Sequence, residues 1–289
     1  MSIPALTDLD AEPQHTEAVL RLLRACPPGR EHAVVGDPTR MGLEPRHEDL
    51  EHCLGVLVLH QGSTVLGTLA ICPYSDSQVT IWGPVVHHGY TRTGVGSRLL
   101  REARTALQSG GYESIRVLVD VRNRSARSFF LAKGLTVWKD NHVYERSLMG
   151  NMPPCPGGVS VSRPTDHDEI TRLLADAFPD SGHIERPLNL REREGYRHHI
   201  LQDSGSIIGA CAVKSTPGRA WLTLAAIQPD LRGKGMGQHL IAGVVANEAA
   251  LGSPKLGLEV LADNAAAITC YRAAGLSRSW TATIMTGPV

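Results

Sequence analysis

The stretch Pro229–Gly237, with the sequence PDLRGKGMG, lies between an apolar run that predicts a strand and an amphipathic run that predicts a helix. Its glycines let the backbone turn tightly and bring N–H groups close to a ligand. The helix that follows presents unpaired N–H groups and the positive end of its dipole. The stretch therefore predicts an anion-binding turn suited to a pyrophosphate. The residues of this turn are Arg232, Gly233, Lys234, Gly235, Met236 and Gly237.

Three phosphate-binding patterns compete for this stretch. A Walker loop needs Ser or Thr after Gly-Lys, but Gly235 follows Lys234. A dinucleotide fingerprint needs G-x-G-x-x-G, whereas the run here is G-x-G-x-G after a late strand. The pattern R-x-x-G-x-G fits Arg232–Gly237 without adjustment. A glycine-rich turn without a ligand is the remaining alternative.

The surrounding sequence occurs twice. Arg92–Leu100 (RTGVGSRLL) matches Gly233–Ile241 (GKGMGQHLI), and Phe129–Leu135 (FFLAKGL) matches Cys270–Leu276 (CYRAAGL), both at an offset of 141 positions. A constant offset over this length indicates a tandem duplication of one unit.

The duplication predicts two α/β domains. A Pro/Gly-rich stretch over residues 150–159 lacks a core pattern and is interpreted as the linker between domains 1–149 and 160–289. In each copy, early strands joined by hairpins are followed by strand–helix–strand–helix–strand, which predicts a mixed sheet. We expect His142–Leu148 to close the sheet of the first copy and Ser279–Met285 that of the second.

Composition excludes several functional classes. Lys+Arg and Asp+Glu both number 29, so no basic surface is expected for nucleic acid or an anionic membrane. The N-terminus lacks a leader pattern and no apolar run is long enough to span a membrane, so we expect a cytoplasmic protein. The six cysteines are scattered along the sequence, a pattern that favours free thiols over a disulfide framework. No zinc-binding spacing occurs, so no metal is expected. The oligomeric state stays open.

Two further features in the second copy point to a family. Asn264 opens the helix that follows the next strand, and Tyr271–Leu276 (YRAAGL) ends it. Together with R-x-x-G-x-G, this sequence resembles the GNAT N-acetyltransferase superfamily, which combines that turn with a downstream Asn and Y-x-x-x-G-F/L. The resemblance covers the whole chain as two tandem GNAT domains and is sharper in the second. Tandem members with an active second half and a degenerate first half are known.

The resemblance implies a fold and a cofactor. Each domain would have a mixed, mostly antiparallel sheet with flanking helices and one splayed pair of parallel strands. Acetyl-CoA would bind in the splay, with its pyrophosphate on Arg232–Gly237 and Asn264 reaching its pantetheine arm. The strand expected to pair with pantetheine consists of Leu224, Ala225, Ala226 and Ile227.

The chemistry requires attack by a neutral amine on a thioester and protonation of the departing thiolate. A phenol stays protonated at pH 7, and by family position Tyr271 is the acid. Glu259 lies on the expected strand that precedes the helix of Tyr271. It is the candidate base because family members often have Glu at this position. Glu185, His198 and His199 are weaker candidates, and deprotonation through water is equally allowed.

The first copy departs from the motif at two positions. Thr91 stands where Arg232 does, and Phe130, which has no proton to donate, stands where Tyr271 does. The retained residues Gly94, Val95, Gly96 and Asn123 are compatible with a phosphate turn. We therefore expect the first domain to be catalytically idle, either structural or holding CoA without turnover.

The sequence thus predicts an acyl-CoA-dependent N-acyltransferase. The expected reaction is transfer of acetyl from acetyl-CoA to a primary amine of a small molecule, by direct attack in a ternary complex in the second domain. Two alternatives stay open. One is a non-catalytic CoA-binding or partner-binding protein, and the other is the same fold with a longer acyl or aminoacyl donor.

Overall fold

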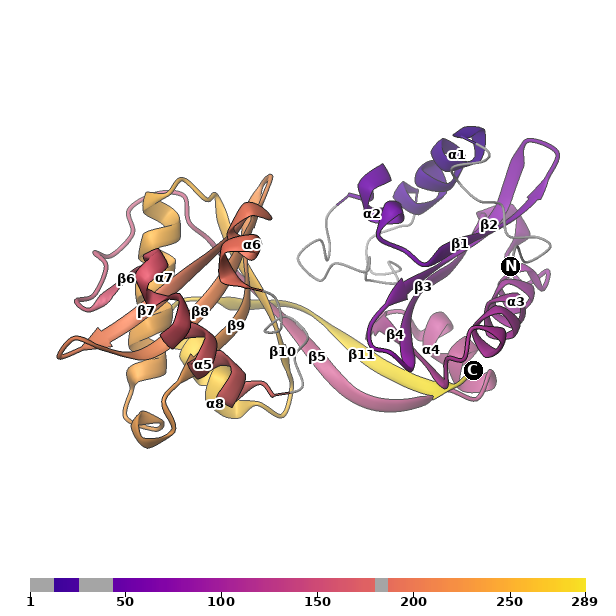
Figure 1. Cartoon of the computed structure of the whole chain (residues 1–289). Coiled ribbons are helices and arrows are strands. Elements are labelled where there is room, and N and C mark those ends of the chain that lie inside the picture. The colour runs from indigo at the N-terminus through magenta and orange to yellow at the C-terminus, as the bar shows by residue number, and fades with distance from the viewer. Residues whose placement is uncertain (1–12, 26–43, 180–186) are drawn as a thin grey trace. The chain divides into compact units, whose positions relative to one another are not determined.

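A computed structural model describes residues 13–25, 44–179 and 187–289 (Figure 1). The chain divides into two compact units, which are described separately. Unit 1 consists of residues 1–140 and 281–289, and unit 2 consists of residues 141–280. This division differs from the expected domains 1–149 and 160–289, because residues 141–149 belong to unit 2 and the last nine residues belong to unit 1.

Unit 1 has a sheet with helices on both faces (Figure 1). Its strand order is β1-β2-β3-β4, followed by the second part of β11 and the first part of β5. The elements are α1 (Pro13–Arg24), α2 (His47–Glu51), β1 (Gly55–Gln61), β2 (Thr64–Pro73), β3 (Gln78–Val86), α3 (Val95–Ser109), β4 (Ser114–Asp120), α4 (Arg124–Ala132) and β5 (Thr136–Ser147).

Unit 2 repeats this arrangement. Its strand order is β5-β10-β9-β8-β7-β6, with the first part of β11 beside β5. The elements are β6 (Val159–Val161), α5 (His167–Ala177), α6 (Leu188–Arg193), β7 (Tyr196–Asp203), β8 (Ser206–Thr216), β9 (Arg219–Ile227), α7 (Met236–Ala250), β10 (Lys255–Leu261), α8 (Ala265–Ala273) and β11 (Ser277–Pro288).

Helical periodicity decides which side chains of unit 2 face its sheet. Apolar residues three and four positions apart form one stripe of a helix, and burial of that stripe stabilises the unit. The stripe of α7 packs on one face of the sheet together with α8, and the stripe of α5 packs on the other face with α6. These buried residues are Leu240, Ile241, Val244 and Val245 in α7, and Ile170, Leu173 and Leu174 in α5.

The two parallel strands of unit 2 separate part-way along their length. β9 and β10 pair only from Ala220 opposite Leu256 to Leu222 opposite Leu258. Beyond these residues β9 continues to Ile227 and stays paired with β8, while β10 keeps its antiparallel pairing with β5. β3 and β4 of unit 1 likewise pair over three positions. Each unit therefore has the splayed pair of strands that the family resemblance implies.

The long strands β5 and β11 contribute residues to both units. Ala282–Pro288 of β11 pair with β4 in unit 1, and Asn141–Ser147 of β5 pair with β10 in unit 2. Met285 is fully buried in the core of unit 1, and Tyr144 is buried in that of unit 2. The expectation that His142–Leu148 closes the sheet of the first copy is therefore wrong, because this segment pairs with β10 of unit 2. The expectation that Ser279–Met285 closes the sheet of the second copy is wrong beyond Trp280. Strand alternation shows which residues are buried but not which strand they pair with, and the two copies offer nearly equal partners.

A buried ion-pair network ties α7 to β7 in unit 2. Glu248 of α7 has no exposed surface and accepts hydrogen bonds from Arg197, from His199 Nε2 at 2.9 Å and from Ser253 at 2.8 Å. Burial by itself raises the pKa of the Glu248 carboxyl, but the hydrogen bonds from His199, Arg197 and Ser253 outweigh burial and lower the pKa to about 2.

Candidate active site

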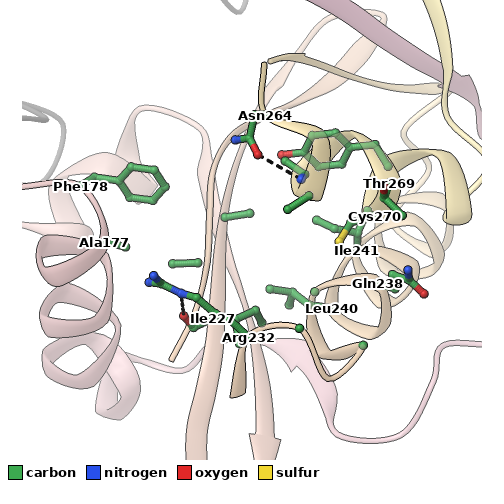
Figure 2. A pocket seen from close by; sticks show the side chains of 18 residues that line it. Ala177, Phe178, Ile227, Arg232, Gln238, Leu240, Ile241, Asn264, Thr269 and Cys270 are labelled. Atoms are coloured by element: carbon green, nitrogen blue, oxygen red, sulfur yellow. Dashed lines mark hydrogen bonds between the residues drawn. The ribbon is translucent and has the colours of Figure 1, made fainter. Parts of the chain in front are cut away.

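A cavity of about 600 Å³ opens in unit 2 where β9 separates from β10 (Figure 2). In Figure 2, Ala177 and Phe178 at the end of α5 lie on one side of it, and Ile241, Thr269 and Cys270 lie on the other. Nine residues that the sequence assigned to the site line it: Ala225, Ala226, Ile227, Arg232, Gly233, Gly235, Gly237, Asn264 and Tyr271.

The glycine turn has the backbone shape that its sequence predicts. Gly233 and Gly235 have φ angles of 75° and 84°, in the left-handed region that other residues rarely adopt. Gly235 is the N-cap of α7, so the unpaired N–H groups of that helix begin at the cavity. A Cβ on Gly237 would lie 3.1 Å from Cys270 Sγ, so a side chain there would crowd the α7–α8 contact. The turn and the helix dipole together suit an anion.

Arg232 lies beside this turn. Its exposed side chain folds back, and its Nε donates a hydrogen bond to the carbonyl of Ile227 at 3.0 Å (Figure 2). Ile227 is the last residue of β9, so the contact fixes the turn against the end of the strand. The guanidinium has further donors besides Nε, which can interact with a phosphate.

Strand β9 offers backbone groups to an extended ligand. After Leu222 its edge on the β10 side has no strand partner among the described residues, because β10 has moved away. Ala225, Ala226 and Ile227 of this segment line the cavity and have small or apolar side chains. An amide-containing chain such as pantetheine can therefore pair with this edge as an added strand.

Asn264 is the N-cap of α8. Its Oδ1 accepts a hydrogen bond from the N–H of Ala267 at 3.1 Å (Figure 2). This contact uses the side-chain acceptor, so Nδ2 is the group with which Asn264 can contact a ligand in the cavity. Asn123 of unit 1 caps α4 in the same way, through Ala126 at 3.0 Å.

Tyr271 lies on α8 and is 8% exposed. It packs with Leu258 and Val260 of β10 and lines the cavity. Burial, with Cys211 and Cys270 nearby, raises the pKa of the Tyr271 phenol. The phenol therefore stays protonated at neutral pH and can donate a proton.

Four predicted site residues do not line the cavity. Leu224 packs under α5, Met236 packs against the core, and Lys234 is exposed. Glu259 faces away from Leu258 and Val260, as strand alternation predicts, and its Oε2 accepts a hydrogen bond from Asn141 at 2.6 Å. Their roles in the site stay predictions.

The alternative bases have separate environments. His199 is held by Glu248 beneath α7, so it belongs to the buried network. His198 points to the opposite face, with its Nδ1 3.7 Å from the Glu192 carboxylate. Burial and the Arg191 guanidinium lower the pKa of His198 to about 4. Glu185 lies outside the described residues.

Unit 1 has the corresponding turn with different side chains. Gly94 has a φ of 90° and is the N-cap of α3, which begins at Val95, as Gly235 is for α7. Arg92, at the position of Gly233, also has a left-handed φ, of 62°. A Cβ on Gly96 would meet Pro84, Val86 and Phe129. The turn is therefore conserved in shape, while bulkier groups surround it.

The described residues show neither a metal centre nor a membrane span. Within ranges 13–25, 44–179 and 187–289, no group of three or more His, Cys, Asp or Glu side chains is arranged to hold a metal ion. No helix in those ranges combines the length and apolar character needed to cross a bilayer.

Comparison with known proteins decides the family. A model of the acetyltransferase (GNAT) family matches residues 16–135 and again residues 167–276. The chain belongs to this family. It is a tandem GNAT N-acetyltransferase, and its cofactor is acetyl-CoA, as the sequence predicts.

Relatives and solved structures resemble the chain over most of its length. Mycothiol acetyltransferase of Mycolicibacterium smegmatis is 28% identical over 232 residues, covering 73% of this chain and 76% of that protein. Mycothiol acetyltransferase of Actinosynnema mirum is 25% identical and covers 94% of this chain and 95% of its own length.

Two solved structures share the fold. A GCN5-related N-acetyltransferase from Sphaerobacter thermophilus has a TM-score of 0.78 at 20% identity and covers 96% of this chain and 93% of its own. A tandem GNAT protein from the clavulanic acid biosynthesis pathway has a TM-score of 0.70 at 16% identity, with 98% and 97% covered.

Several residues of the cavity carry no motif. Ala177 and Phe178 come from a helix remote in sequence, and Gln238, Leu240 and Ile241 continue the α7 face that begins at the turn. The spacing of three and four positions after Gly237 is the signal that could have identified Leu240 and Ile241. Asn141 was missed because it precedes the linker, in the first copy of the sequence.

Proposed function

We propose that unit 2 is the catalytic unit and that it transfers acetyl from acetyl-CoA to a primary amine of a small molecule, by direct attack in a ternary complex. The observation that carries this proposal is the cavity itself, in which the glycine turn, the free edge of β9 and the Tyr271 side chain meet. These three features supply an anion site, an amide-pairing edge and a proton donor.

Each part of acetyl-CoA has a place in this arrangement. The N–H groups at the start of α7, with Arg232 beside them, would hold the pyrophosphate, and the backbone of Ala225–Ile227 would pair with pantetheine. Tyr271, which lines the cavity where β9 and β10 separate, would then face the thioester. When bound, acetyl-CoA supplies the acetyl group and a thiolate leaving group.

The chain's own side chains handle the protons. Tyr271, protonated at neutral pH because its pKa is raised, donates its proton to the departing thiolate. Glu259, on the other face of β10, takes a proton from the attacking amine directly or through water. Backbone N–H groups of β9 stabilise the negative charge that develops on the carbonyl oxygen.

The nature of the acceptor is supported by the relatives. The curated relatives that match most of this chain are named mycothiol acetyltransferases, which supports a small-molecule amine here. Unit 1 has Phe130 in place of Tyr271 and lacks a phenol at that position, which supports an idle first unit.

Release of free CoA thiol from acetyl-CoA across a panel of amines tests the proposal. We expect Tyr271→Phe to lower kcat by about 100-fold or more, the range of general acid catalysis, with KM for acetyl-CoA unchanged. Tyr144→Phe is the matched control, because Tyr144 is buried in the same core cluster but lies outside the cavity, and it should keep full activity.

Three outcomes would contradict the proposal. Full turnover in Tyr271→Phe with an identified acceptor would remove the acid assignment. CoA binding without thiol release for any amine would favour a non-catalytic CoA-binding protein. Calorimetry on the full chain, comparing Gly235→Val with Gly94→Val, shows which unit binds CoA. Loss of binding in Gly94→Val alone would place the site in unit 1.

A further inference from the structure

The strand β5 brings an amide side chain to the candidate base. Asn141 is 5% exposed, and its Nδ2 donates a hydrogen bond to Glu259 Oε2 at 2.6 Å. In the antiparallel pair of β5 and β10, Val143 lies opposite Glu259 and Asn141 lies opposite Leu261. Asn141 and Glu259 are therefore diagonal neighbours on one face of the sheet, within reach of side-chain contact.

Glu259 lies on β10 at the point where this strand separates from β9. It directly follows Leu258, the last residue of β10 that pairs with β9, so it stands where the two strands begin to separate. Leu258 and Val260 face the core that contains Tyr271, and Glu259 faces the other way. The phenol and the carboxylate therefore lie on opposite sides of the split. In this arrangement the phenol can protonate the departing thiolate while the carboxylate takes the proton of the attacking amine.

The duplicated unit provides an internal comparison. In unit 1, β11 pairs with β4 in the same register at an offset of 141, with Ile284 opposite Leu118 and Ala282 opposite Asp120. Leu118 and Ala282 stand at the positions of Glu259 and Asn141, and both are buried. The fold therefore accepts two apolar residues at this site.

The polar pair and the phenol occur together in unit 2 and are absent together from the equivalent positions of unit 1, where Phe130 replaces Tyr271. A buried amide and a half-buried carboxylate cost free energy unless they are hydrogen-bonded, so packing gives no reason for the pair. A catalytic role does give one.

We infer that Asn141 is a positioning residue that fixes the Glu259 carboxylate for deprotonation of the amine. This inference rests on the proposed function of unit 2. By holding Oε2, Asn141 fixes the rotation of the carboxylate about its terminal bond, and misplacement of a catalytic group by about 1 Å can cost up to 100-fold in rate. Asn141 itself does not touch the reacting atoms.

A double-mutant cycle on the full chain tests the role, with steady-state kinetics and thermal unfolding for each variant. We expect Asn141→Ala to lower kcat about tenfold and to leave KM for acetyl-CoA within about twofold, because the cofactor turn is untouched. In the Glu259→Gln background the same substitution should lower kcat by less than about twofold, since the two residues act as one unit. Asn141→Asp, nearly isosteric, should lower kcat more than Asn141→Ala because it sets two carboxylates against each other.

Thr68→Val is the control for a lost buried hydrogen bond. Thr68 lies in unit 1, is 2% exposed and donates to the carbonyl of Leu57 at 3.0 Å, so its replacement should lower stability without changing kcat. If Asn141→Ala does not fold, Asn141→Asp carries the test.

Three results overturn the inference. Two of them remove the positioning role: an unchanged kcat in folded Asn141 variants, or an equal loss of kcat on Asn141 substitution in the wild-type and Glu259→Gln backgrounds. In both cases acetyl transfer by the wild type would leave the proposed function intact. Absence of transfer by the wild type would reject the proposed function, and the inference with it.

Discussion

Replacing Met285 with Ala tests the assignment of the last strand to unit 1. Met285 is fully buried on β11, opposite Val117 of β4, and packs in the core of unit 1. Truncating a buried Met to Ala costs about 2–5 kcal/mol, so about 3 kcal/mol is expected here. Since 1.4 kcal/mol is a factor of ten, the open state of the affected unit should become about 100-fold more populated.

Hydrogen exchange followed by mass spectrometry locates this loss. Peptides from Ser114–Asp120 report on unit 1, and peptides from Lys255–Leu261 report on unit 2. We expect exchange to accelerate in the first set and to stay near wild type in the second. Met149→Ala is the matched control, because Met149 is 72% exposed and should change stability by less than about 0.5 kcal/mol. Faster exchange confined to Lys255–Leu261, or equal in both sets, would refute the assignment.

Three further predictions concern unit 2. Gly235→Ala should raise KM for acetyl-CoA about tenfold, because a left-handed Ala costs about 1–2 kcal/mol at the turn; Gly252→Ala, with a similar φ of 82°, should leave KM unchanged in the same assay. Because the pKa of Glu248 is lowered from 4.5 to about 2 in the fold, its charge stabilises the folded state above pH 4.5, and this stabilisation is lost as the pH falls toward 2. The urea midpoint of the wild type should therefore drop in this window by an amount equivalent to about 3 kcal/mol of unfolding free energy, and the midpoint of Glu248→Gln should not. Arg146→Ala should cost about 1–2 kcal/mol in thermal unfolding, because Arg146 donates to the carbonyl of Ala274 at the C-terminus of α8, and Arg146→Lys should recover part of it.

The sequence predicted the anion turn and both helices around it. The turn Arg232–Gly237, the strand that ends at Ile227 and the helices that begin at Met236 and Ala265 all lie where their patterns place them. Such features are local, because glycine conformation, helix capping and apolar periodicity act over a few residues. Local signals of this kind are readable without knowledge of the rest of the chain.

The sequence did not indicate which strands pair with each other at the end of each sheet. Residues Asn141–Ser147 and Ala282–Pro288 have the alternation of half-buried strands, but alternation is equally satisfied by β4 or β10 as the neighbour. The Asn141–Glu259 contact depends on that choice, since it joins residues 118 positions apart. Phe178 reaches the cavity through the packing of α5, which is also a tertiary effect.

The exchange of strands has a consequence for synthesis on the ribosome. β4 ends at Asp120, but its neighbour in the sheet begins to pair at Ala282, more than half of the chain later. At about 5–20 residues per second, roughly 10–30 s separate the emergence of the two segments. During that interval β4 is an edge strand with unpaired backbone groups and an apolar sequence, which is a template for aggregation. The first unit to be translated is therefore the last to be completed, and a nascent chain that stalls before residue 282 lacks the native partner strand of β4.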